Sequence, residues 1–158
     1  MSSLRHEHLV RINDPANTIS RWLTREQLWE GLRRTILVPK CIDASIDAAT
    51  VRETEPNRLE RQIRRGRATM CDWVELTTGE RLTIHADRAS IFAGSTLTIQ
   101  IEEPAPGMLF VRFTYELQGL ESGRTDEEDQ ARRSAYQHSD IERVRQARKF
   151  AEERGVKH

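Results

Sequence analysis

An alternation of inward and outward positions marks the first predicted strand of the chain. The period of two over residues 6–12 is typical of a β-strand, and Asn13-Asp14-Pro15 supplies the turn that ends it. One face of this strand carries His6, His8, Val10 and Ile12. Thr24 and Gln27 form a capping box, which predicts a short helix over residues 25–34. A second helical turn over 35–42 is a weaker prediction, because Pro39 lies inside it.

Residues 45–118 read as a run of six strands. Turn residues recur without any helical period between them, and this spacing is typical of hairpins in an antiparallel meander. The turns are expected at Glu55-Pro56-Asn57, Gly66, Thr78-Gly79, Ala93-Gly94 and Pro104-Ala105-Pro106-Gly107. Each strand is apolar on one face and polar on the other, so the sheet should be packed on one side only. The apolar face carries Leu59, Ile63, Met70, Val74, Leu82, Ile84, Leu97, Ile99, Ile101, Val111, Phe113, Tyr115 and Leu117.

The last part of the chain predicts one long helix over residues 127–154. Acidic residues gather in its first turn and basic residues toward its end, as the helix dipole favours. We expect an apolar stripe of Ala131, Ala135, His138, Ile141, Val144 or Ala147, and Ala151. Most of these side chains are small. A stripe this thin should leave space against a curved sheet, and packed interiors seldom leave space unfilled.

The predicted fold is α+β: a curved seven-stranded antiparallel sheet wrapped around a long C-terminal helix, with two short helices after the first strand. At 158 residues, the chain fits one domain covering 1–158.

Composition narrows the function classes. Lys+Arg and Asp+Glu number 25 each, so the net charge is zero, which argues against a nucleic-acid or anionic-membrane partner. The mean hydropathy of −0.69 and the lack of a long apolar run argue against a membrane protein. Cys41 and Cys71 have no metal-ligand spacing, so we expect no metal, no cofactor and reduced thiols in the cytoplasm.

Eight short segments of the chain form a recognisable set of motifs: Glu7-His8-Leu9-Val10, Ile12-Asn13-Asp14-Pro15, Leu23 to Trp29, Leu97-Thr98-Ile99, Ile101 to Pro104, Leu109 to Glu116, Ser134-Ala135-Tyr136 and Asp140-Ile141. Together they resemble the START/SRPBCC superfamily, whose helix-grip fold is shared with plant pathogenesis-related allergens, and within it the AtaL-like branch. The resemblance implies an apolar cavity between sheet and helix. Its members bind lipids, steroids or polyketides, and some are cyclases or hydrolases. The stretch Leu37 to Ala48 departs from the branch, so the resemblance does not extend to the cavity entrance there.

Two polar residues interrupt the predicted apolar face. A two-residue turn at Gly66-Arg67 makes Arg61 and Asp72 a direct cross-strand pair, whereas a turn at Arg65-Gly66 makes them diagonal neighbours. A buried Arg needs a partner, and Asp72 is the nearest carboxylate on the same face. The pair either fixes the strand register or presents the Arg61 guanidinium to a ligand carboxylate or enolate.

Three further polar residues are candidates for the cavity. The hydroxyl of Tyr115 forms a hydrogen bond either with another group of the protein or with an oxygen atom of a ligand. His8 and His138 are core histidines or, if they lie near Asp72 or Tyr115, titrating groups of a site. Trp73 has the opposite parity, and an exposed indole there would mark a contact of a homodimer.

The function expected from this pattern is binding of a small, mostly apolar or amphipathic molecule. The apolar lining is expected to be Val10, Ile12, Met70, Val74, Ile84, Leu97, Ile99, Val111, Phe113 and Ala135. Arg61, Asp72, Tyr115, His8 and His138 are the polar candidates. One alternative is a cyclase or hydratase that uses the same cavity, although a salt-bridged Asp72 would be a poor base. The other is an interaction module whose cavity is filled by its own side chains.

Overall fold

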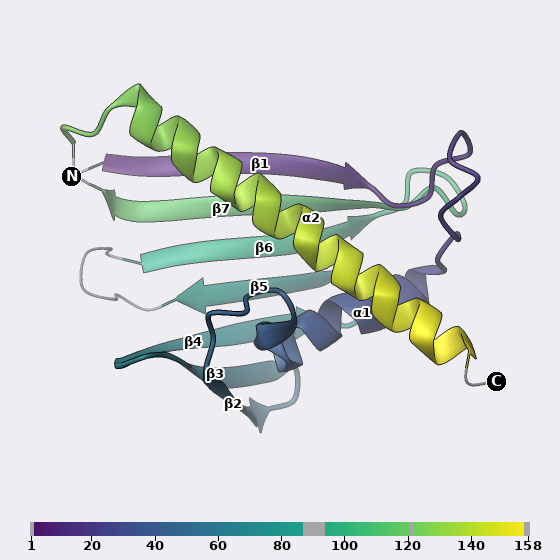
Figure 1. Ribbon diagram of the computed structural model, residues 1–158, viewed down its shortest axis with the longest axis horizontal. Helices are drawn as coiled ribbons and strands as arrows, with labels where there is room; N and C mark the ends of the chain where they lie inside the picture. Colours follow the sequence, from purple (N-terminus) through teal and green to yellow (C-terminus); the bar gives the residue numbers. More distant parts are fainter. Residues whose placement is uncertain (1, 87–93, 121, 157–158) are drawn as a thin grey trace.

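A computed structural model of the protein describes residues 2–86, 94–120 and 122–156, and it has the predicted helix-grip architecture (Figure 1). The element order is β1 (Ser2–Arg11), α1 (Arg25–Leu37), a 3-10 helix η1 (Pro39–Cys41), β2 (Ala48–Glu55), β3 (Arg58–Arg65), β4 (Ala68–Thr77), β5 (Arg81–Ala86), β6 (Gly94–Glu102), β7 (Phe110–Leu120) and α2 (Asp126–Val156). The capping box at Thr24 is present at the start of α1. One residue of the expected turn at Ala93-Gly94 lies outside the described residues.

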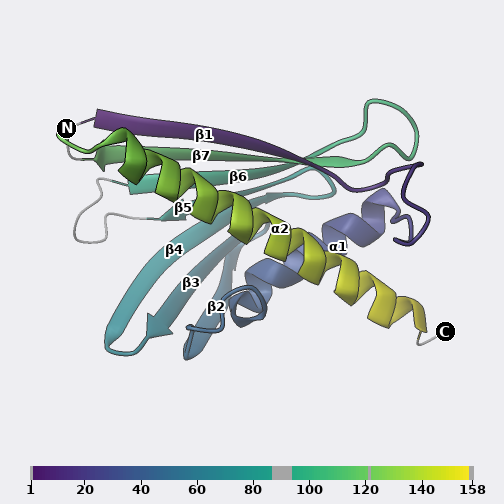
Figure 2. The same cartoon turned by 45° about the horizontal axis from the view of Figure 1, so that its top comes forward.

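The seven strands form one antiparallel sheet in the order β1-β7-β6-β5-β4-β3-β2. The first strand therefore pairs with the last, and β1 and β2 are the two edges. Helix α2 runs diagonally across the concave face, and α1 lies on the same side toward the end where β1 finishes (Figures 1 and 2). This arrangement places one layer of helix over one curved layer of sheet, with the core between them.

Helix α1 and the C-terminal half of α2 pack closely against each other. At Gly31, an added Cβ would lie 2.5 Å from the carbonyl oxygen of Ala147 and 2.8 Å from its Cα, so only glycine fits at this crossing. Leu28, Leu32 and Ile36 of α1 are completely buried beside it. The region where α1 crosses the C-terminal half of α2 is therefore close-packed hydrophobic core.

The inward face of α2 differs from the predicted stripe. Ala135, His138 and Ile141 are exposed, so the prediction that Ala135 and His138 face the sheet is wrong. Val144, Ala147 and Ala151 of the predicted stripe are buried as expected. Nearer the middle of the helix, the inward side chains are instead Tyr136, Asp140 and Arg143. Apart from His138, the prediction followed apolar residues, whereas polar groups of the sheet allow polar side chains to face inward here. The inward side chains near the middle of α2 are consequently larger than the alanines of the predicted stripe.

Within the described residues, no helix is both long and apolar enough to cross a membrane.

Candidate functional site

A polar cluster lies between the middle of α2 and the concave face of the sheet. Its centre is Asp140, which is completely buried. One carboxylate oxygen, Oδ1, accepts a hydrogen bond from the hydroxyl of Tyr115 on β7. The other, Oδ2, lies 3.1 Å from Nδ1 of His8 on β1. Both oxygens are thus engaged, which is how a carboxylate is tolerated away from water.

Burial changes the proton affinities in this cluster. Loss of hydration raises the pKa of the Asp140 carboxyl above its usual range, despite the hydrogen bonds from Tyr115 and His8 that oppose the change. Burial and the neighbouring Asp140 charge also raise the pKa of Tyr115. Asp140 is therefore a carboxyl that holds its proton more tightly than a solvated one, a property common in functional sites.

Arg61 and Asp72 form a buried ion pair on the same face. Strands β3 and β4 pair with Arg61 directly opposite Asp72, which confirms the register expected from a turn at Gly66-Arg67. Arg61 Nε and Nη2 donate to the two Asp72 oxygens at 2.8 and 2.7 Å, and Nη1 donates to the Ile36 carbonyl at 3.0 Å. Every nitrogen of this guanidinium has a protein partner. The geometry matches a pair that fixes register and anchors the end of α1.

Arg143 is the second buried guanidinium of the interface, and sequence reasoning missed it. It follows Asp140 by one helical turn and is 7% exposed. Its Nη1 donates to the Thr35 hydroxyl at 2.7 Å, and Thr35 in turn donates to the Leu32 carbonyl. Burial, together with the nearby Arg61 charge, lowers the pKa of Arg143 to about 10. Arg143 therefore remains a cation at neutral pH, in a place where a cation is poorly hydrated.

Three aromatic side chains flank the buried carboxylate. The Tyr115 and Tyr136 rings stack with centroids 4.0 Å apart and planes 8° from parallel. The His6 ring lies 6.2 Å from Tyr115 and 6.1 Å from Tyr136. Within the described part of the chain, Nε2 of His6 is buried with no hydrogen-bond partner. Burial and the nearby Arg133 charge lower the pKa of His6, so its ring stays neutral at pH 7.

The concave face has a closed half and an open half. The closed half, under α1, consists of Leu59, Val74, Leu82 and Ile99, all at most 3% exposed. The open half consists of Met70, Asp72, Ala86 and Leu97; Met70 is 41% exposed and the other three are half-buried. Leu97 is the direct cross-strand partner of Tyr115, so the open half adjoins the polar cluster. Solvent thus reaches apolar side chains next to buried polar groups.

The structure places the remaining predicted lining residues on the concave face, mostly in the core. Ile12, Ile84, Val111 and Phe113 are buried and Val10 is half-buried. The predicted set therefore divides: Met70, Leu97, Arg61, Asp72, Tyr115 and His8 gather around the open half, while Val74, Ile99 and Phe113 pack in the core. The missed residues Tyr136, Asp140 and Arg143 were detectable as a polar stripe at helical spacing.

Two of the hollows formed by the described residues have volumes above 500 Å³. One, of about 510 Å³, lies over β2, β3 and β4 beside Trp73, and Arg61 and Asp72 are among the residues that line it. The indole of Trp73 is half-buried; it stacks on His85 at 4.0 Å and lies under the Arg58 guanidinium at 3.9 Å. The other hollow, of about 950 Å³, lies between α1 and the strand ends near Gly79. Within the described residues, no group of three or more His, Cys, Asp or Glu side chains is arranged to hold a metal ion.

Comparison with known proteins assigns the chain to a family. Residues 10–154 match the model of the AtaL family, described as acetylaranotin biosynthesis cluster protein L. The chain belongs to this family. No curated protein matches the sequence of this AtaL family member. Its helix-grip fold recurs in solved structures with little sequence identity.

Two similar structures are larger than this chain. The di-domain aromatase/cyclase StfQ from the steffimycin biosynthetic pathway superposes with a TM-score of 0.72 at 15% identity, covering 98% of this chain and 52% of StfQ. The di-domain aromatase/cyclase BexL from the BE-7585A pathway gives a TM-score of 0.69 at 13% identity, covering 95% of this chain and 50% of BexL. The chain thus spans about half the length of these two proteins.

Two others are of similar size. The Zhui aromatase/cyclase from Streptomyces sp. R1128 gives a TM-score of 0.67 at 11% identity, covering 97% of this chain and 96% of Zhui. Ara h 8.0201 gives 0.59 at 10% identity, covering 95% of this chain and 98% of that protein. At these identities the likeness shows the fold alone.

Proposed function

We propose that the protein binds a small, mostly apolar ligand at the open half of the concave face. The observation that carries this proposal is the partial exposure of Met70 and Leu97 beside the buried cluster of Tyr115 and Asp140. Ligand sites are typically apolar surfaces with a few fixed polar groups, and this region has both. In this proposal Tyr115 and His8 orient the ligand together with Asp140, while the Arg61–Asp72 pair holds the strands beneath it.

The comparisons support a ligand of the polyketide or aromatic class. Three of the similar solved structures are named as aromatase/cyclases, and the family is named after a protein of a biosynthesis cluster. A shared fold does not transfer an activity, since one fold hosts many functions. The ligand class is therefore proposed from the fold together with the apolar and aromatic side chains at the open half.

A filling substitution tests the location. In Leu97→Trp the larger side chain would occupy the open half, so affinity for the neutral fluorescent probe N-phenyl-1-naphthylamine should fall by about tenfold, the size of a lost apolar contact. The matched control is Leu9→Trp. Leu9 lies on β1, on the face of the sheet opposite to Leu97, and is 44% exposed. Equal affinities in Leu97→Trp, Leu9→Trp and the wild type would place the probe elsewhere, and no binding by the wild type would favour an interaction module with a filled interior.

Native mass spectrometry of protein purified from its own host would identify the ligand. A co-purifying small molecule is expected with the wild type and should be depleted in Leu97→Trp. Recovery of the same molecule at equal occupancy from both proteins would contradict binding at the open half.

A second candidate, a cyclase or hydratase, is favoured by one observation: the raised pKa of Asp140 and its contacts with His8 and Tyr115. A carboxyl whose pKa is shifted toward neutral pH is suited to proton transfer at a carbon next to a carbonyl. Asp140 takes this role in place of Asp72, whose two oxygens are held by Arg61. The test is deuterium exchange at the α-carbons of 2-tetralone, followed by NMR. Acceleration by the wild type and its loss in Asp140→Asn would support catalysis, and exchange at the uncatalysed rate would leave binding as the function.

A further inference from the structure

The two buried guanidinium groups of the helix–sheet interface differ in how many partners they have. Arg61 donates from all three nitrogens to protein oxygens, two of them on a carboxylate. Arg143 is equally buried, yet within the described residues it makes one hydrogen bond, to the neutral hydroxyl of Thr35. Its Nε and Nη2 have no protein acceptor there. A guanidinium has five N–H donors, so most of the Arg143 fork is unused.

No described carboxylate is in ion-pair contact with Arg143. Asp140, one turn away on the same helix, has its two oxygens occupied by Tyr115 and His8. Asp72 is held by Arg61. A buried charge without a partner is strongly unfavourable, and removing one member of a buried pair typically destabilises a protein. Arg143 therefore has the character of one half of an ion pair whose other half is not found among the described residues.

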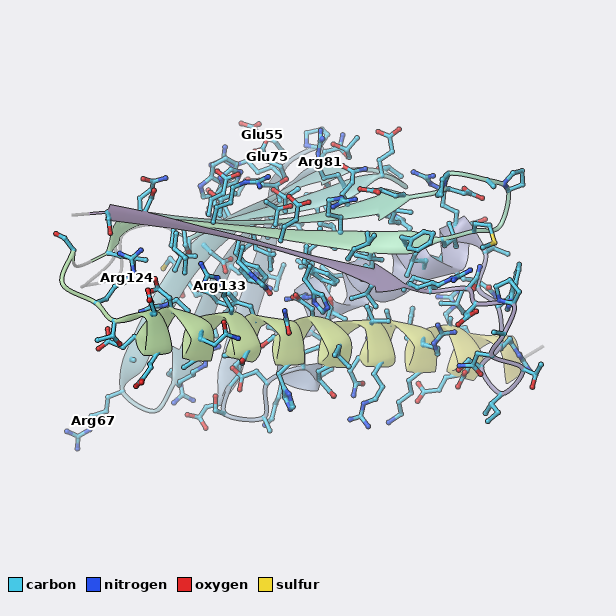
Figure 3. All side chains as sticks on the ribbon, turned by 90° about the horizontal axis from the view of Figure 1, so that it is seen from above. Glu55, Arg67, Glu75, Arg81, Arg124 and Arg133 are labelled. Carbon is cyan, nitrogen blue, oxygen red and sulfur yellow. The ribbon has the colours of Figure 1, made fainter. Side chains whose placement is uncertain are left out.

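The N-terminal half of α2 adds a second cation on the same side of the helix. Arg133 lies between α2 and the sheet (Figure 3), and its charge is close enough to lower the pKa of His6. The buried Nε2 of His6 is itself without a partner among the described residues. Besides the paired Arg61, the interface thus holds the cationic side chains of Arg143 and Arg133 and one ring nitrogen without a partner among the described residues. Cations of this kind favour oxygen atoms of an anionic ligand.

We propose that Arg143 binds an ionised acidic group of the ligand, so that the protein selects apolar organic acids, carboxylates above all, over neutral molecules of the same shape. The inference rests on the proposed function, because it names the chemical class of ligand for the same open half. A planar guanidinium recognises a carboxylate through two parallel hydrogen bonds, which Nε and Nη2 of Arg143 are free to make. The apolar body of the acid would then lie against Leu97 and Met70.

A pair of fluorescent probes isolates the charge. 8-Anilinonaphthalene-1-sulfonate carries one anionic group, and N-phenyl-1-naphthylamine has the same aromatic skeleton without it. The wild type should bind the anionic probe more tightly than the neutral one. In Arg143→Met the affinity for the anionic probe should fall about tenfold or more, as expected for a lost charge-assisted hydrogen bond. The affinity for the neutral probe should stay within about twofold, which also shows that the variant is folded.

The matched control is Arg145→Met, two residues further along α2. Arg145 is exposed and paired with Glu142, so its loss removes the same formal charge from the same helix without touching the open half. Both affinities should be unchanged. An equal effect of the two substitutions, or equal loss of both probes in Arg143→Met, would overturn the inference while leaving the proposed function in place. If the wild type binds neither probe, the proposed function fails and this inference fails with it.

Discussion

The closed and open halves of the concave face are built on the same strands but from different chemistry. In the closed half, Val74, Leu82 and Ile99 are almost completely buried beneath α1. In the open half, the same strands carry the half-buried Asp72 and Leu97, beside the buried Tyr115. The boundary falls within single strands, between residues two apart on the same face, such as Asp72 and Val74. If the protein binds a ligand as proposed, stability and ligand recognition are separated along each strand rather than between strands.

Helix α2 shows the same division along its length. Its C-terminal half faces the core with Val144, Ala147 and Ala151, and Ala147 touches Gly31 so closely that no side chain fits between the helices. Its N-terminal half faces the sheet with Tyr136 and Asp140, and Arg143 marks the transition. A helix whose only role was to cover the core would carry apolar residues along the whole length of its inward face. The polar inward stretch is costly to bury, which indicates selection for something other than stability.

The largest expected effect contrasts the two halves directly. Leu32→Ala removes a completely buried side chain above the closed half and should lower the free energy of unfolding by about 2–5 kcal/mol. Met70→Ala, in the open half, should cost less than about 1 kcal/mol, because this side chain is already 41% exposed. Urea unfolding followed by circular dichroism measures both. Similar losses for the two variants would show that the halves are equally packed.

The helix crossing gives the next effect. Gly31→Ala places a Cβ against the backbone of Ala147, which cannot move without shifting α2, so the free energy of unfolding should fall by about 1–3 kcal/mol. Gly123→Ala is the control, since no atom lies within 4 Å of an added Cβ there. The same urea titration applies. An unchanged midpoint for Gly31→Ala would mean that α2 slides freely over α1, and the contrast between its two halves would lose its basis.

Arg143→Met should act in the opposite direction. It replaces a buried cation that has one hydrogen bond by an apolar side chain of similar length, so the free energy of unfolding should stay level or rise by about 1 kcal/mol. Arg145→Met should change it by less than about 0.5 kcal/mol, as is usual for an exposed position. Thermal unfolding in the absence of ligand distinguishes the two. A marked loss of stability in Arg143→Met would identify Arg143 as a structural residue of the closed half.

The sheet could be predicted closely from the sequence, because its signals are local. Strict alternation placed Arg61 and Asp72 on one face, and the Gly66-Arg67 turn, one of the two turns considered, is the one that the strand pairing confirms. The inward face of α2 could not be predicted from the sequence, because we assumed that inward-facing residues of the helix are apolar. Asp140 faces inward since Tyr115 and His8, distant in sequence, satisfy its oxygens. Such partners can be identified only once β1 and β7 are known to be neighbours. The unused donors of Arg143 can be recognised only once both oxygens of Asp140 are known to be bonded to Tyr115 and His8.

The smallest expected effect concerns the pH dependence of stability. The pKa of Asp140 is higher in the folded protein than in the unfolded chain. Between these two values the folded state binds more protons than the unfolded state, so this residue makes the free energy of unfolding fall as pH rises through that window. Above the window, the cost of the buried charge is fully present. Asp140→Asn does not titrate, and its amide can accept from Tyr115 and donate to His8.

The variant should therefore be more stable than the wild type at pH 7, and the difference should shrink as the pH is lowered toward the usual range of a carboxyl. Unfolding by urea at a series of pH values measures it, with Asp129→Asn as a control at a carboxylate nearer the surface that is paired with Arg124. His8, Tyr115 and Arg143 face Asp140 and are unchanged in the variant, so their contributions largely cancel in the difference. A difference that is constant with pH would show that Asp140 is solvated like an exposed carboxyl. The open half would then lack the buried acid that distinguishes it from the closed half.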